Sequence, residues 1–190
     1  MCKHIVMCRA TPEKFERLDG GQIHAPAGGS SVTGLYTIGH SNHSLDGFLS
    51  LLSEHQIAVL VDVRSSPWSK FNPHFARPSL RAAVLGLGVN YFWAGKELGG
   101  LAPLATTNQL FQGRMKQVVG ISQEQRLAMM CSEGNPKDCH RAYKLAAYLH
   151  RVDGPDVLHI LRDGSAVDSR EFEAQQSESW LHQDFGGTKT

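Results

Sequence analysis

The order of apolar and polar residues along the chain predicts strands that alternate with helices. Short, nearly continuous runs of apolar and β-branched residues, such as 57–63, are typical of strands covered on both faces. The segments between these runs carry apolar residues at helical spacing. This alternation favours an α/β domain with a mainly parallel sheet of about five strands and helices on both faces, layered as in Rossmann-like or rhodanese-like folds. The predicted strands span 35–38, 57–63, 89–93, 126–130 and 157–161.

Side chains suited to helix starts mark where the predicted helices begin. Ser44 and Asn108 can accept hydrogen bonds from the first free amides, and Pro78 suits a first helical turn. Asp138 is expected to cap the helix between the last two predicted strands in the same way. A further helix over 169–183 is a weaker prediction, because its apolar residues are sparse.

The first 33 residues differ from the rest of the chain. Residues 20–34 are rich in Gly, Pro, Ala and Ser and show no hydrophobic period, which indicates a linker or a loose arm. The short apolar run before them favours either a brief strand or a disordered terminus. The sequence therefore predicts an N-terminal arm over 1–33, ordered or disordered, and one α/β domain over 34–190.

Composition narrows the class of protein without naming a ligand. Apolar residues make up 41% of the 190-residue chain and charged residues 19%, which fits a globular domain with its own core. The formal net charge of +1 carries no signal for nucleic acid or a membrane surface. No apolar run reaches the roughly 20 residues of a membrane span, and no secretory leader is evident. We therefore expect a reduced, cytoplasmic protein whose four cysteines do not form a disulfide framework.

Polar residues gather in three loops that each follow a predicted strand, at 40–44, 64–75 and 131–141. The carboxyl ends of parallel strands lie at one edge of the sheet, and ligands bind at that edge in open α/β folds. We therefore expect the three loops to converge and to form one pocket.

The first two loops offer acid/base and anion-binding groups. His40 is a candidate general acid or base, and Ser41, with the amides near a helix start, can hold an anion. Arg64 directly follows a buried strand, so it either grips a phosphate or carboxylate or forms a salt bridge to Asp62 or Glu133. Further ligand-binding candidates are Ser66, Lys70 and Asn72 in the second loop and Glu97 in a glycine-rich turn at 96–100.

The third loop leaves three interpretations of its cysteines open. Cys131 can be a thiolate nucleophile, with Glu133 as an acid or base beside it. Cys131, Cys139 and His140 can instead bind a metal ion, although their spacing is no recognised zinc pattern and a complete set needs His40 or His74 from another loop. Both cysteines can also be ordinary buried residues.

Two cations stand at the start of the helix that follows this loop. The helix dipole disfavours positive charge there, so His140 and Arg141 are expected to have an anionic partner. That partner is either a carboxylate of the same loop, Glu133 or Asp138, or a bound ligand. Both cations are therefore ligand-binding candidates.

Four motifs resemble one known family. They lie at 36–41 (YTIGHS), 61–75 (VDVRSSPWSKFNPHF), 97–100 (ELGG) and 130–141 (MCSEGNPKDCHR), and over roughly 35–164 the chain resembles the domain-of-unknown-function family numbered 488. The resemblance implies a compact α/β domain with a shared polar site, and it implies no defined activity. The shared positions are His40, Ser41, Asp62, Arg64, Pro67, Ser69, Asn72, Glu97, Cys131, Glu133, Cys139, His140 and Arg141.

The chain departs from that family in two places. The segment between residues 100 and 108 is shorter than usual, which removes part of an expected lid or wall, and the arm 1–33 has no counterpart. A more distant analogy to rhodanese-like domains, which also pair an Asp-x-Arg segment with a cysteine loop, extends to the fold alone.

Two functional hypotheses follow from the sequence. The first is an enzyme whose three-loop pocket binds an anion, either a phosphate or a nucleotide, because aromatic residues such as Trp68 and cations such as Lys70 mix in the second loop. The second is a non-catalytic module that binds a ligand or a metal ion and has structural cysteines. Nucleic acid stays open as a ligand, a membrane is not expected, and no cofactor is indicated.

Overall fold

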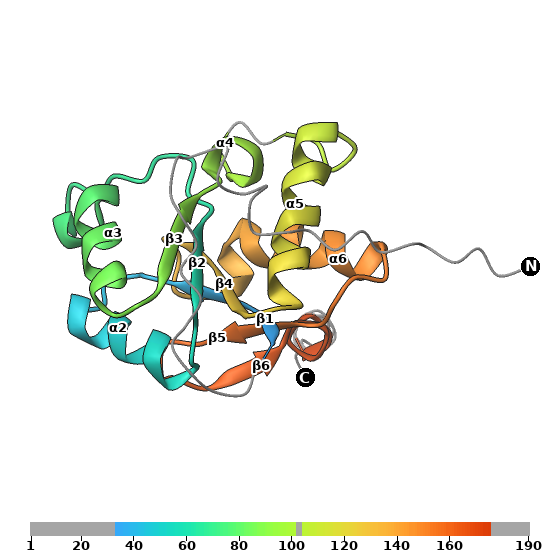
Figure 1. Ribbon diagram of the computed structural model, residues 1–190. Helices are drawn as coiled ribbons and strands as arrows, with labels where there is room; N and C mark the ends of the chain where they lie inside the picture. The colour runs from blue at the N-terminus through green and yellow to red at the C-terminus, as the bar shows by residue number, and fades with distance from the viewer. Residues whose placement is uncertain (1–32, 102–103, 176–190) are drawn as a thin grey trace, which may run out of the picture.

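The computed structural model describes residues 33–101 and 104–175, and within them a six-stranded sheet forms the centre of the fold (Figure 1). The strand order is β3-β2-β4-β1-β5-β6. The first five strands pair in parallel, and β6 pairs antiparallel with β5 at one edge. The strands are β1 (Gly34–Gly39), β2 (Val59–Asp62), β3 (Asn90–Trp93), β4 (Arg126–Cys131), β5 (Val157–Ile160) and β6 (Ala166–Asp168).

Helices cover both faces of the sheet, as the sequence predicts (Figure 1). On one face lie α2 (Leu45–Glu54) and α3 (Arg77–Gly86), and on the other lie α5 (Gln109–Ser122) and α6 (Ala147–Arg151). Shorter helical elements include α4 (Gly95–Leu98), 3-10 turns at Pro73–Phe75 and Pro136–Asp138, and a π-helix at Arg141–Ala146 that runs into α6.

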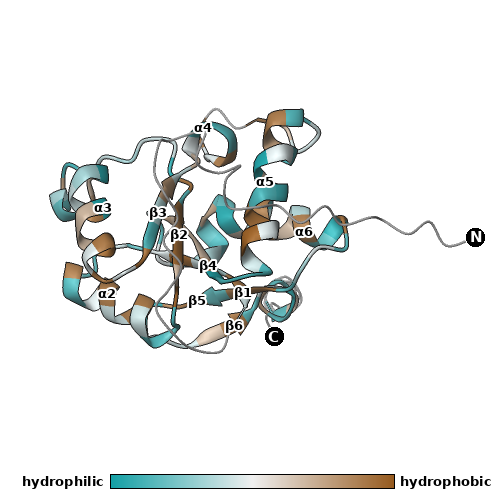
Figure 2. Ribbon diagram, in the orientation of Figure 1, coloured by the Kyte–Doolittle hydropathy of each residue, from teal (hydrophilic) through white to brown (hydrophobic). Residues whose placement is uncertain are grey.

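The core forms two layers because successive side chains of each strand point to opposite faces. Val59 and Val61 of β2 pack with Phe111 of α5, whereas Leu60 packs with Phe48 of α2. Figure 2 shows these strands as mostly apolar, and helices such as α2 and α5 as a mixture of apolar and polar positions. The five parallel strands, β1 to β5, are mostly buried, which accounts for their apolar sequence runs. The prediction of an α/β fold is confirmed.

Most predicted helix starts are confirmed. The Ser44 hydroxyl accepts from the Gly47 amide at 3.1 Å, and the Asn108 side chain accepts from the Leu110 amide at 2.8 Å. The prediction for Asp138 is wrong. Pro136 starts a 3-10 turn that contains Asp138, and the π-helix after it has no side-chain cap.

The C-terminal part contains a strand that the sequence analysis missed. A turn after β5 leads into β6, which has only three residues and none fully buried, so no apolar run marks it. Residues 169–175 then begin a helix, while the rest of the predicted tail helix and the arm 1–32 lie outside the described residues. In the described part of the chain, no helix is long and apolar enough to cross a bilayer.

Candidate functional site

A cavity of about 390 Å³ opens where the loops after β1, β2 and β4 meet. These three strands are neighbours and run parallel, so their carboxyl ends bring the loops together as predicted. The cavity is lined by His40, Arg64, Ser65, Ser66, Trp68, Ser69, Gly100, Leu101, Cys131, Ser132, Glu133, Asp138, Cys139, His140 and Tyr143.

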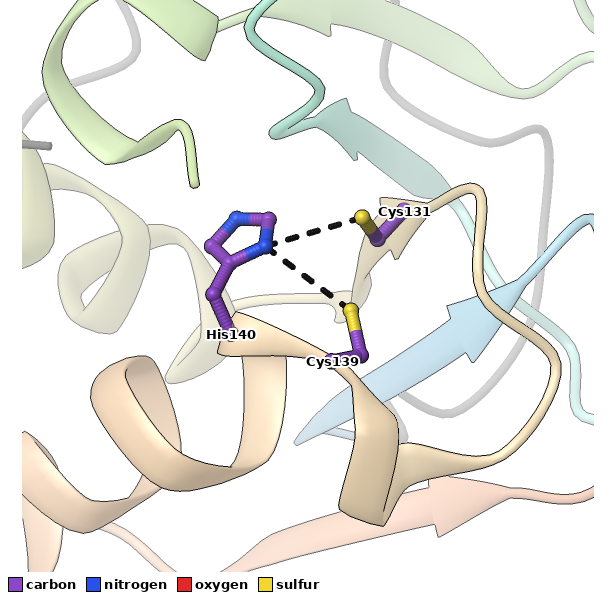
Figure 3. Close-up of side chains that lie close together, drawn as sticks. All are labelled: Cys131, Cys139 and His140. Carbon is purple, nitrogen blue, oxygen red and sulfur yellow. Dashed lines mark hydrogen bonds between the residues drawn. The ribbon is translucent and has the colours of Figure 1, made fainter. Parts of the chain in front are cut away.

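Two thiols and an imidazole converge in the wall of this cavity (Figure 3). Cys131 ends β4, Cys139 follows the 3-10 turn, and His140 precedes the π-helix. The Nδ1 atom of His140 lies 3.6 Å from the sulfur of Cys131 and 3.8 Å from that of Cys139. The three atoms lie within 4.8 Å of one another, and all three residues are buried. We call this group the sulfur–imidazole cluster.

The two cysteines of the cluster are electrostatically unequal. A hydrogen bond from the Cys139 thiol lowers the pKa of Cys131, and His140 and the Ser132 amide act in the same direction against the cost of burial. Donation to Cys131, together with burial, raises the pKa of Cys139. The cluster therefore favours a thiolate at Cys131 and a thiol at Cys139.

The imidazole of His140 is tightly enclosed. A methyl group on Gly100 would lie 2.9 Å from its Nδ1 atom, so the close approach of the 99–101 turn requires glycine at this position. Its Nε2 atom is buried and has no hydrogen-bond partner within the described residues. These contacts hold the ring so that Nδ1 faces both sulfurs.

Arg64 lines the cavity, and each nitrogen of its guanidinium has a partner within the protein. Nε donates to Asp62 at 2.9 Å, Nη2 donates to the same carboxylate at 2.6 Å, and Nη1 lies 3.2 Å from the Nε2 atom of His40. The hydroxyl of Tyr91 also donates to Asp62, at 2.6 Å. Of the two alternatives that the sequence leaves open, the geometry is that of the structural salt bridge to Asp62.

His40 is a neutral, fixed imidazole in this arrangement. Burial lowers its pKa to about 4, although the Ser41 carbonyl opposes this shift. Its Nδ1 atom lies 2.9 Å from that carbonyl, and its ring stacks on Phe75 with the centroids 4.3 Å apart. The carbonyl requires the proton on Nδ1, so Nε2 accepts from Arg64 and its lone pair is occupied.

Arg141 is fully buried and does not line the cavity. Nη2 donates to the Gly134 carbonyl at 2.7 Å, and Nη1 donates to the Glu133 carbonyl. Backbone carbonyl dipoles thus partner this cation in place of the expected carboxylate or ligand. Gly39 makes room for the clamped loop, because a side chain there would run into the Glu133 carbonyl.

The other predicted residues divide between the cavity and its surroundings. Ser66 and Glu133 line the cavity, whereas four predicted ligand-binding residues do not. Glu97 is paired with Arg114 at 3.3 Å. Besides Arg141, the predicted ligand-binding residues outside the cavity lining are Ser41, Lys70, Asn72 and Glu97.

The structure also places residues at the site that the sequence analysis missed. Tyr143 lines the cavity and is exposed, and Tyr91 reaches Asp62 from the neighbouring strand. Tyr143 could have been predicted from the sequence, because it lies two residues after the Cys139–Arg141 segment, in the first turn of the expected helix. Tyr91 carried no signal, because an aromatic residue in a strand is ordinary core material.

Comparison with known proteins bears on the family and not on the activity. The family model described as "Domain of unknown function DUF488" matches residues 44–149, which is more than half of the chain. The chain belongs to this family. The matched range of DUF488 contains Arg64 and the whole sulfur–imidazole cluster, and His40 lies just before it. Searches of curated proteins and of solved structures found no match.

Proposed function

We propose that this DUF488 protein is an enzyme that acts through the Cys131 thiolate in the cavity. The observation that supports it is the position of Cys131, which lines the cavity and has its sulfur 3.6 Å from the Nδ1 atom of His140. A thiolate is the nucleophilic form of cysteine, and a neighbouring imidazole and thiol stabilise that form.

The groups around Cys131 suit attack on a polar electrophile. His140 and the Cys139 thiol hold the negative charge on sulfur before the attack. Glu133 lines the cavity, and its carboxylate can exchange a proton with a leaving group. The hydroxyls of Ser66 and Ser132 can hydrogen-bond a substrate, and Trp68 adds an apolar wall at the mouth.

The internal partners of the two buried arginines favour chemistry at the Cys131 sulfur over binding of an anion by these arginines. Arg64 donates to Asp62 and His40, and Arg141 donates to two backbone carbonyls. A phosphate in the cavity would reach Arg64 only through the N–H groups that Asp62 and His40 leave unused. The predicted pocket for a phosphate or nucleotide stays a prediction.

A second candidate function is metal binding by the same cluster. Tetrahedral zinc with Zn–S about 2.3 Å and Zn–N about 2.05 Å separates sulfur from nitrogen by about 3.6 Å. The observed separations of 3.6 and 3.8 Å are close to this value. Among the described residues, however, the cluster supplies three ligand atoms. Of the two expected further ligands, His40 faces Arg64 and His74 faces the His43 carbonyl.

The rate of alkylation separates the two candidates. Iodoacetamide should modify Cys131 much faster than it modifies a free thiol at pH 6, where a free thiol is almost fully protonated. The modified residue is located by peptide mass spectrometry, and zinc content is measured on the same preparation. Stoichiometric zinc together with an unreactive Cys131 would favour the second candidate and contradict the first.

A further inference from the structure

We infer that Cys139 is the resolving cysteine for Cys131, and that the substrates of the cavity are disulfides reduced by this pair. The inference rests on the proposed function, because it needs Cys131 as the attacking group. It adds a second reacting residue and a class of substrate.

The first support is the position of the two sulfurs. Both contact the same Nδ1 atom of His140, at 3.6 and 3.8 Å, and all three atoms lie within 4.8 Å of one another. A disulfide needs its sulfurs about 2.05 Å apart, so a further approach is required. Rotation of the two short side chains about their Cα–Cβ bonds is the smallest movement that can supply it.

The second support is the segment that joins the two cysteines. Seven residues separate Cys131 at the end of β4 from Cys139, and the side chains of Glu133, Lys137 and Asp138 in that segment are exposed. Arg141 holds the start of this loop at the Glu133 and Gly134 carbonyls, so the adjustment falls on the residues between Gly134 and Cys139, where Lys137 and Asp138 are exposed. Cys139 also lies next to a π-helix, an irregular helical form that occurs frequently at functional sites.

The third support is that Cys131 and Cys139 both line the same cavity. A substrate sulfur bonded to Cys131 would therefore sit beside Cys139. The aromatic side chains of Trp68 and Tyr143, which are 69% and 65% exposed, lie at the same cavity and can contact the organic part of a disulfide.

The reaction balances as two successive exchanges. The Cys131 thiolate attacks one sulfur of the substrate disulfide, an S–S bond forms, and the first substrate thiolate leaves. Cys139 gives up its proton to the departing thiolate, and its sulfur attacks the Cys131 sulfur, which releases the second substrate thiolate. The substrate gains two electrons, the protein is left with a Cys131–Cys139 disulfide, and an external dithiol reduces it again.

The test uses the full chain with Cys2→Ser and Cys8→Ser, so that the described cysteines alone react. An aromatic nitrobenzoate disulfide, whose thiolate product is coloured, serves as the substrate probe. We expect this parent to release two coloured thiolates per chain, to keep no adduct and to lose two hydrogens in mass. With the added substitution Cys139→Ser, we expect one released thiolate and an adduct retained on Cys131.

The outcomes separate the inference from the proposed function. A parent that releases one thiolate and keeps the adduct on Cys131 would overturn the resolving role but would leave Cys131 as the nucleophile. A parent in which neither cysteine reacts in the folded state, while both react after denaturation, would overturn both. If Cys139→Ser does not fold, as judged by circular dichroism, the mass of the parent and the amount of thiolate that it releases still decide whether Cys139 resolves the adduct.

Discussion

The guanidinium of Arg64 and the carboxylate of Asp62 form a two-point ion pair that is almost completely buried. Nε and Nη2 donate to separate carboxylate oxygens at 2.9 and 2.6 Å, and the side chains are 4% and 0% exposed. Because Nη1 also reaches His40, the pair ties the end of β2 to the end of β1 beside the cavity. The arginine is therefore part of the cavity wall.

Removing one partner of this pair should strongly destabilise the fold. Asp62→Ala leaves the Arg64 charge and the Tyr91 hydroxyl buried without their acceptor, so we expect unfolding to become easier by about 3–5 kcal/mol. The control is Asp156→Ala, which breaks a pair with Arg170 whose side chains are 75% and 50% exposed. That change should cost less than about 1 kcal/mol. Equal effects in urea denaturation would contradict a structural role for Asp62.

Acid should destabilise the protein in a defined range. Burial lowers the pKa of both His40 and His159 to about 4, from an ordinary value near 6.5. Between these values the unfolded chain binds protons at the two histidines that the folded chain does not, so their contribution to stability is complete above about pH 6.5 and is lost as the pH falls toward 4. The loss is at most about 3 kcal/mol for each histidine. Urea denaturation at several pH values should show a shallower decline for His159→Asn than for the parent, and an unchanged decline would contradict the prediction.

Gly39 should resist substitution because of the loop that crosses it. A methyl group there meets the Glu133 carbonyl, which Arg141 holds in place. We expect Gly39→Ala to cost about 1–3 kcal/mol and to slow alkylation of Cys131 by displacing the loop. The control is Gly113→Ala within α5, where a methyl group meets no atom of the described residues within 4 Å. That change should stabilise by about 0.5–1 kcal/mol.

The arrangement of strands was predictable where burial leaves a mark on the sequence. The β-branched run that includes Val59 and Val61 is covered on both faces, and the same holds for the other parallel strands. The edge strand β6 has three residues, none fully buried, so burial imposed no pattern on it. Convergence of the three loops followed from parallel pairing and needed no side-chain detail.

The partners within the site were less predictable, because they depend on side-chain torsions and on backbone atoms. From the sequence, Arg64 could turn toward Asp62 or toward a ligand. The hydroxyl of Tyr91, from another strand, also donates to the Asp62 carboxylate, and the sequence does not indicate this contact. Arg141 donates to two backbone carbonyls, and every residue has such a carbonyl, so the sequence does not indicate which ones it contacts. Cys139 is placed near Cys131 by the 3-10 turn that begins at Pro136. The sequence analysis expected Asp138 to cap a helix instead and did not predict this turn.

The ionisation of Cys131 is the property that most directly tests the proposed function. The ultraviolet absorbance of thiolate can be titrated in metal-free protein that carries Cys2→Ser and Cys8→Ser, with the further variant Cys131→Ser as the control. We predict one thiolate per chain at neutral pH that persists below pH 6 and is absent in Cys131→Ser, because Cys139 and His140 lower the pKa of Cys131. A thiolate signal that appears only near the ordinary thiol pKa of about 8.5 would contradict Cys131 as the nucleophile.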